Sequence, residues 1–147
     1  MRVMMIGDVV SQPGCDFLRK TLPAFKREQK LDAVVCNGEN SAVGNGILPH
    51  SADFLFDSGV DVITGGNHSL RRREIQDYLD DHPNLLRPAN YPDGCCGNGL
   101  TDPFRGVGLF FKICVQQIQT SRRIAVDPAI VVIVAQSYAA LPKFVLD

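Results

Sequence analysis

The first 90 residues of the chain alternate between short apolar runs and segments whose apolar residues recur at helical spacing. The runs predict four strands, which are Arg2–Ile6, Asp32–Asn37, Val60–Thr64 and Leu85–Arg87. Strands that alternate with helices form crossover units, and such units build a mainly parallel sheet. The sequence therefore predicts an α/β fold in which a mainly parallel sheet is flanked by helices.

Three predicted helices separate or follow these strands. The first comes after a Gly7–Pro13 loop and contains Pro23, which is expected to kink it. The second covers residues 51–58 and ends before Gly59, a suitable helix C-cap, and the third covers residues 72–81. The side chains expected to face the core are Phe17, Leu18, Thr21, Leu22 and Phe25 in the first helix, Ala52, Leu55 and Phe56 in the second, and Ile75, Tyr78 and Leu79 in the third.

The rest of the chain is less clearly patterned. A proline- and glycine-rich segment, Pro88–Pro103, is expected to be a loop. Beyond it, alternating apolar residues over 107–115 predict a strand, and the apolar run 130–134 predicts a buried strand. A chain of 147 residues is long enough for one domain with a hydrophobic core, and one domain is the prediction.

Composition and charge exclude several classes of protein. The formal net charge of −1 gives no basis for a stable nucleic-acid complex held by bulk electrostatics. The longest late apolar run, Ala129–Ala135, is far shorter than the roughly 20 residues of a membrane helix, so no membrane association is expected. Five cysteines, an odd number without C-x-x-C spacing, indicate neither a disulfide framework nor a zinc knuckle. A reducing, cytoplasmic location is the prediction.

Polar residues that can bind a metal follow three of the predicted strands. Gly7-Asp8 ends the first strand, Asn37-Gly38-Glu39-Asn40 ends the second, and Gly65-Gly66-Asn67-His68 follows the third. Glycines let the backbone turn sharply, and open α/β sheets place ligands at the carboxyl ends of their strands. We therefore expect the three groups to form one site.

The oxygen donors at these positions suit a hard cation. Asp8, Glu39 and Asn67 offer carboxylate and amide oxygens to Mg²⁺, Mn²⁺ or iron, and a carboxylate such as Glu39 can bridge two cations. Two metals about 3.5–4 Å apart hold a hydroxide between them and clamp phosphoryl oxygens during in-line attack. His68, next to Asn67 in the sequence, could then protonate the departing oxygen as a general acid.

Each of these residues also has a structural explanation when it is taken alone. Asp8 could be a loop or capping carboxylate, and Asn67 could be a helix N-cap. Glu39-Asn40 could form a turn, and His68 could be a surface histidine. The run Arg71–Arg73 could contact phosphate beside the site or could simply begin a solvated helix. The joint occurrence of four such groups at three successive strand ends favours a site.

Five motifs follow one another in the first part of the chain, and they are Ile6–Val10, Asn37–Asn40, Gly59–Thr64, Gly66–His68 and Leu86–Pro92. In this order they resemble the YmdB-like branch of the calcineurin-like metallophosphoesterases, and the combination is highly specific. The resemblance covers about residues 1–101, so that residues 102–147 form a divergent tail of a single, truncated domain. It implies a dinuclear-metal phosphodiesterase that acts on cyclic nucleotides, with an incomplete form of the family's layered α/β sandwich.

The resemblance also implies roles for the residues at the strand ends. Asp8 would bind one metal, Asn67 would bind the other, and Glu39 would bridge the two. Asn40 would contact the phosphate or the nucleophile, and His68 would be the proton donor. The cofactors implied are two divalent or mixed-valence ions of Mn, Fe, Mg or Zn, and the substrate is a small phosphodiester.

Members of this branch complete their metal shells with three histidines from their second half, whereas the three histidines of this chain are His50, His68 and His82. One alternative is therefore a truncated, catalytically impaired homologue that binds metal or phosphate, or a subunit that a second chain completes. The end of the resemblance near Thr101 predicts a truncated or frame-shifted reading frame. The run Ala129–Ala135 could then drive homo-oligomerisation or aggregation. A Rossmann-type nucleotide module is disfavoured, because no G-x-G-x-x-G follows the first strand.

Overall fold

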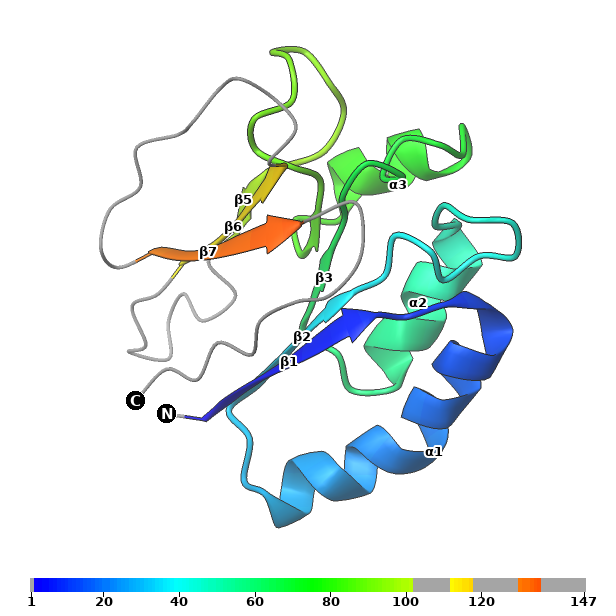
Figure 1. Ribbon diagram of the computed structural model, residues 1–147, viewed down its shortest axis with the longest axis vertical. Helices are drawn as coiled ribbons and strands as arrows, with labels where there is room; N and C mark the ends of the chain where they lie inside the picture. Colours follow the sequence, from blue (N-terminus) through cyan, green and yellow to red (C-terminus); the bar gives the residue numbers. More distant parts are fainter. Residues whose placement is uncertain (1, 102–111, 118–129, 136–147) are drawn as a thin grey trace.

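The computed structural model describes residues 2–101, 112–117 and 130–135, and these residues form two β-sheets (Figure 1). The first sheet has the strand order β1-β2-β3-β4 and the second the order β5-β6-β7. The strands are β1 Val3–Asp8, β2 Ala33–Asn37, β3 Val62–Thr64, β4 Leu85–Leu86, β5 Leu100–Thr101, β6 Lys112–Gln117 and β7 Ile130–Ala135. The helices are α1 Ser11–Glu28, α2 Pro49–Asp57 and α3 Ile75–Asp81.

The first sheet is parallel throughout, as the sequence predicts. β1 pairs with β2, β2 with β3 and β3 with β4, all in parallel. On one face of this sheet Val34, Cys36 and Ile63 share a buried core with Leu18 of α1 and Leu55 of α2. Figure 1 shows α1 and α2 on one side of the sheet and β5–β7 on the other. The predicted α/β fold, a parallel sheet flanked by helices, is confirmed.

Helix α1 begins earlier than predicted. It starts at Ser11 and includes Pro13, so the expected Gly7–Pro13 loop is much shorter. Proline fits the first turn of a helix because the N–H that it lacks would have no partner there. Pro23 lies inside α1, and Figure 1 shows the helix bending along its course, as expected for an internal proline.

The buried face of α1 is narrower than predicted. Leu18 and Leu22 are buried, together with Cys15, which lies on the same side of the helix. The side chains wrongly predicted to face the core are Phe17, at 65% exposed, Phe25, at 43% exposed, and Thr21, which is also exposed. Successive helical residues point about 100° apart, so a neighbour of a buried leucine faces the core only where the covered surface is wide. Only one stripe of α1 meets the sheet.

The C-terminus of α2 forms the predicted glycine cap. Gly59 has a φ of 102°, a value that favours glycine. Its amide donates to the carbonyl of Phe56 at 2.9 Å, and the amide of Val60 donates to the carbonyl of Leu55 at 3.3 Å. This pair of bonds satisfies two helix-end carbonyls and directs the chain into β3.

The amino-terminal ends of the strands are joined by one carboxylate, Asp61. Its Oδ2 accepts hydrogen bonds from the Lys26 ammonium at 2.6 Å and from the Val34 amide at 2.7 Å. The Lys26 ammonium also donates to the carbonyl of Gly59 at 3.0 Å. The carboxylate is therefore paired with a cation and links α1, β2 and the segment before β3.

Helix α3 begins at Ile75, three residues later than predicted. The guanidinium of Arg72 instead donates to the carbonyls of Asn45 at 3.0 Å and Val43 at 2.5 Å. A Cβ at Gly46 would lie 2.8 Å from the Arg72 Cγ, so the arginine packs closely against this loop. Arg72 is therefore a structural residue, and the interpretation of the whole arginine run as a solvated helix start is wrong.

The predicted loop Pro88–Pro103 contains a strand and is tied to its surroundings. β5 lies within it and pairs with β6 in antiparallel fashion. The Arg87 amide donates to the Asn98 carbonyl at 2.9 Å, and the Gly97 amide donates to Oδ1 of Asp80 at 2.6 Å. The segment is a packed connector.

The later strand predictions are confirmed as far as the described residues reach. β6 covers the end of the predicted strand 107–115, whose residues 107–111 lie outside the described ranges. β7 contains the predicted strand 130–134 and runs parallel to β6. The division at residue 101 and the origin of the tail stay predictions. Within the described ranges, no helix combines the length and the apolar character that crossing a membrane demands.

Candidate metal centre

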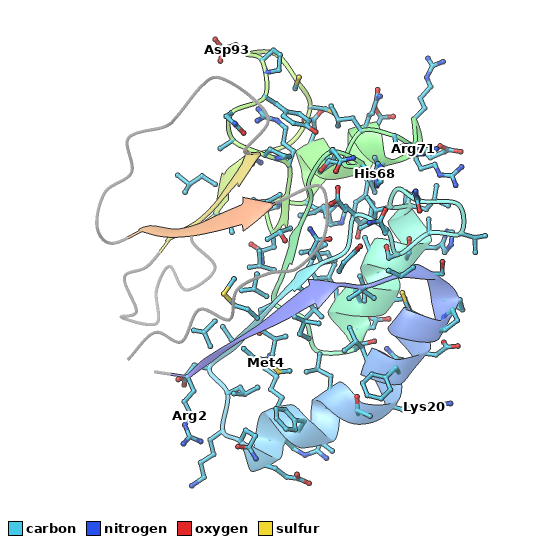
Figure 2. The ribbon with its side chains drawn as sticks, in the orientation of Figure 1. Arg2, Met4, Lys20, His68, Arg71 and Asp93 are labelled. Carbon is cyan, nitrogen blue, oxygen red and sulfur yellow. The ribbon has the colours of Figure 1, made fainter. Side chains whose placement is uncertain are left out.

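The ends of β1, β2 and β3 bring four of the predicted site residues into one hydrogen-bonded cluster, and these are Asp8, Glu39, Asn40 and His68. Asn40 Nδ2 donates to both carboxylate oxygens of Asp8, at 3.0 and 2.9 Å. Asn40 Oδ1 lies 2.6 Å from Nδ1 of His68. Figure 2 shows His68 beyond the carboxyl ends of the strands, at the opposite end of the first sheet from Arg2. Three loops that are distant in sequence therefore meet at the edge where a parallel sheet places its ligands.

These contacts fix the protonation pattern of the His68 ring. The Asn40 side chain uses its Nδ2 to donate to Asp8, so its Oδ1 faces His68 as an acceptor. Nδ1 of His68 must then carry the hydrogen of this bond. Nε2 is left as the ring nitrogen that can gain or lose a proton, as a general acid requires.

Glu39 is a buried carboxylate that forms no ion pair with a lysine or arginine among the described residues. It is 8% exposed, and its Oε2 accepts a hydrogen bond from the His68 amide at 2.7 Å. Burial raises the pKa of the Glu39 carboxyl and the charge of Asp8 acts in the same direction, while the bond from the His68 amide and the charge of the His68 ring oppose the rise. Within the described part of the chain, the ion pair present joins Lys26 to Asp61, and none reaches Glu39 or Asp8. Glu39 and Asp8 have no lysine or arginine partner among the described residues, and a divalent ion would neutralise two such carboxylates.

The two glycines before Asn67 are required for space. A Cβ at Gly66 would lie 2.5 Å from Oε1 and 2.6 Å from Oε2 of Glu39, and a Cβ at Gly65 would lie 1.9 Å from the Ser69 hydroxyl oxygen. Neither glycine has a positive φ, so the predicted need for unusual backbone freedom is not the reason for them. Gly66 allows the backbone to pass directly against the Glu39 carboxylate.

Two residues that the sequence reasoning did not single out hold this backbone in place. The Gly66 amide donates to the Ser69 hydroxyl at 2.8 Å, and that hydroxyl donates to the Gly66 carbonyl at 2.8 Å. The Tyr91 hydroxyl donates to the same carbonyl at 2.7 Å. Burial and the charge of Glu39 raise the pKa of Tyr91, so the phenol stays protonated and able to donate. The signal that could have pointed to Tyr91 is its place in the Leu86–Pro92 motif.

Asn67 is exposed, and its side chain makes no hydrogen bond to any described residue. The N-cap of α3 is Glu74, so Asn67 does not begin that helix and the N-cap alternative is wrong. The Asn67 side chain is thus available to a ligand from outside the chain. Its assignment as a metal ligand stays a prediction.

The remaining histidines do not extend the cluster. His50 is an exposed residue of α2, and the ring of His82 stacks on Tyr78 with centroids 3.5 Å apart. Among the described residues, no group of three or more His, Cys, Asp and Glu side chains could hold a metal. The candidate centre is therefore a set of oxygen donors: the Asp8 and Glu39 carboxylates and the Asn67 amide.

Comparison with known proteins finds a family model and curated relatives that match this chain. The YmdB-like protein family model matches residues 4–127. A 2',3'-cyclic-nucleotide 2'-phosphodiesterase of Bacillus subtilis is 46% identical over 101 residues, which are 69% of this chain and 38% of that protein. The chain therefore spans well under half the length of this curated relative.

Two solved structures share the fold. A hypothetical protein from Thermus thermophilus superposes with a TM-score of 0.67 at 34% identity, and the match covers 80% of this chain and 44% of the Thermus chain. A structure described as a novel phosphatase from Mycoplasma pneumoniae superposes with a TM-score of 0.69 at 23% identity, over 82% and 44% of the two chains. The second likeness concerns the fold alone.

Proposed function

Because the chain belongs to the YmdB-like family, whose model matches residues 4–127, we propose that it is a metal-dependent phosphoesterase. Its substrates would be small phosphodiesters such as cyclic nucleotides, the class named for the Bacillus relative. The protein is also proposed to act in the cytoplasm, because four of its cysteines are free thiols, namely Cys15, Cys36, Cys95 and Cys96.

The observation that carries the proposal is the pair of carboxylates, Asp8 and Glu39, which form no ion pair with a described side chain. Asp8 is exposed, whereas Glu39 is buried, and a buried carboxylate is costly unless the protein pairs it or uses it to hold a metal. Mg²⁺ and similar ions keep several waters and bind proteins through one or two carboxylates. The donors present therefore suit a divalent cation, with Asp8, Glu39 and Asn67 as the residues that would hold it.

A pair of divalent or mixed-valence ions, of Mn, Fe, Mg or Zn, would act as Lewis acids on the phosphoryl oxygens and lower the pKa of water at the site. The chain's own contribution to the chemistry would come from His68 and Asn40. Asn40 holds Nδ1 of His68, which leaves Nε2 to deliver a proton to the departing oxygen. Asn40 is in turn oriented by Asp8, so the acid is placed by one of the candidate ligands.

A second candidate function is metal or phosphate binding without turnover. The observation in its favour is the short list of protein ligands, since no group of three or more His, Cys, Asp and Glu side chains lies together within the described residues. Loss of a residue that merely supports a ligand costs about 10–100-fold in metal affinity or activity, so an incomplete shell should cost at least as much. A second chain that supplies further ligands would restore catalysis.

The test is hydrolysis of a chromogenic phosphodiester by the purified chain with Mn²⁺, with and without a chelator, in wild type, Glu39→Ala and His68→Ala. His50→Ala is the matched control, because His50 is exposed and lies on α2. The phosphoesterase proposal predicts chelator-sensitive hydrolysis that is lost in the first two variants and kept in the control. The same background in all four proteins, together with Mn²⁺ binding that Glu39→Ala removes, would favour the binding function.

A further inference from the structure

We propose that Tyr91 and Ser69 are positioning residues that fix the Gly66 backbone and thereby hold the His68 amide against Glu39, with Asn67 between them in the chain. The two hydroxyls and the Gly66 backbone are called the Gly66 clamp below. The inference rests on the proposed function, since it assigns these residues to the same site. They touch neither a metal nor a substrate in this account.

The clamp binds both backbone polar groups of Gly66, which belong to the peptide units on either side of this residue. The Ser69 hydroxyl accepts from the Gly66 amide and donates to the Gly66 carbonyl, both at 2.8 Å. The Tyr91 hydroxyl donates to the same carbonyl at 2.7 Å. Ser69 is 2% exposed, so its contacts are shielded from water. A carbonyl with two side-chain donors leaves the peptide little rotational freedom.

A fixed peptide is needed at this position because the adjoining groups have few contacts of their own. Gly65 to Ser69 belong to no helix or strand, and after the bond from the Gly65 amide to the Leu86 carbonyl, at 2.7 Å, the backbone bonds of the segment are local turns. The side chain of Asn67 makes no hydrogen bond to a described residue. The His68 amide has the Glu39 carboxylate as its acceptor, at 2.7 Å. The direction in which the His68 amide points therefore depends on how the backbone at Gly66 is held.

The fit of Gly66 against Glu39 makes a small rotation harmful. The position of a Cβ on Gly66 is already filled by the Glu39 oxygens, 2.5 and 2.6 Å away. A turn of the peptide would push the backbone toward the carboxylate or draw the His68 amide away from it. Without that amide, the buried carboxylate would lose a hydrogen bond that stabilises its charge.

Tyr91 is itself held by an anchored segment. Its own amide donates to the carbonyl of Pro88 at 3.2 Å. On the far side of the loop, the Arg87 guanidinium donates to the Cys96 carbonyl at 3.1 Å. The Gly97 backbone packs against Leu79, where a Cβ would approach the leucine Cβ to 2.9 Å. The phenol therefore reaches the site from a rigid support, as a positioning residue should.

The test uses the full chain and the variants Tyr91→Phe and Ser69→Ala. Tyr78→Phe is the matched control, because the Tyr78 hydroxyl also donates one hydrogen bond, to Asp53 at 2.6 Å, but on α3. The first measurement is the hydrogen-exchange rate of the His68 amide in the metal-free protein by NMR. The second is the affinity for Mn²⁺ by calorimetry.

Loss of one neutral hydrogen bond predicts His68 amide exchange about two- to tenfold faster in Tyr91→Phe than in wild type, with a similar loss of Mn²⁺ affinity. Tyr78→Phe should change neither quantity. Equal exchange rates in Tyr91→Phe, Tyr78→Phe and wild type would overturn the clamp.

Two further comparisons distinguish a failure of the clamp from a folding defect and from a failure of the proposed function. If Ser69→Ala fails to fold because Ser69 is buried, Tyr91→Phe still decides the matter, since Tyr91 is only half-buried. If wild type binds no Mn²⁺, the proposed function fails, whereas the exchange rate of the His68 amide still tests the clamp. Restored exchange protection in a Ser69→Thr protein that regains the hydroxyl lost in Ser69→Ala would support it further.

Discussion

The carboxylates at the two ends of the parallel sheet differ in whether they form an ion pair. At the amino-terminal ends, Asp61 is paired with the Lys26 ammonium at 2.6 Å and with a backbone amide. At the carboxyl-terminal ends, the hydrogen-bond donors that the described residues offer to Asp8 and Glu39 are amides. A neutralised carboxylate joins elements of the fold, whereas the Asp8 and Glu39 carboxylates are the ones proposed to hold a metal ion. The contrast separates the part of the molecule that stabilises the fold from the part that is proposed to act.

Replacing the proposed acid should give the largest effect. We expect His68→Ala to lower the turnover of a chromogenic phosphodiester about 10²- to 10⁴-fold, the usual contribution of a general acid. Mn²⁺ affinity should change much less, because the ring is bonded to Asn40 and is not a proposed ligand. His82→Ala is the control, since that ring stacks on Tyr78. Comparable turnover in the two variants would exclude His68 as the acid.

The same glycine substitution at the two ends of the sheet should have different consequences. Gly66→Ala places a Cβ against the Glu39 oxygens, so we expect a loss of about 1–3 kcal/mol in the free energy of unfolding and loss of Mn²⁺ binding. Gly59→Ala, at the cap of α2 with a φ of 102°, should cost about 1–2 kcal/mol and leave Mn²⁺ binding intact. Urea denaturation and calorimetry measure the two quantities. Equal Mn²⁺ affinities in the two variants would contradict the assignment of Gly66 to the site.

Removing the charge of Asp61, at the amino-terminal ends of the strands, should have the smallest effect on stability and activity. The Asp61 side chain is 33% exposed, so solvent screens its pair with Lys26. We expect Asp61→Asn to lower the free energy of unfolding by about 0.5–1 kcal/mol, as for a partly exposed ion pair. Turnover and Mn²⁺ affinity should match wild type. A chelator-sensitive change in turnover in this variant would mean that the two ends of the sheet are not independent.

The fold was predictable where local patterns decide it. Apolar runs such as the one at Val34 and Cys36 predict buried strands, and the glycine at position 59 predicts a helix cap, because each depends on neighbouring residues. The exposure of Phe17 was not predictable in this way. Which stripe of a helix meets a sheet depends on tertiary packing, and the sequence of the helix alone does not specify it.

The site was predictable as a group of residues but not in its supports. Asp8, Asn40 and His68 could be expected to meet because parallel strands end at one edge of a sheet. The roles of Ser69 and Tyr91 could not be predicted, because both hydroxyls bond to the backbone of Gly66. Every residue has such backbone groups, so the sequence does not show which of them a side chain will bind. The spatial reason for Gly66 was equally hidden, since its neighbour Glu39 lies on another loop.

The most direct test of the central claim is a calorimetric titration of Mn²⁺ into the chelator-treated full chain, in wild type, Glu39→Gln and Asp61→Asn. Both variants remove one negative charge from a carboxylate of similar size, at opposite ends of the same sheet. The account predicts that wild type and Asp61→Asn bind Mn²⁺ alike and that Glu39→Gln loses at least about tenfold in affinity. Unchanged affinity in Glu39→Gln would contradict a metal centre at the carboxyl ends of the strands.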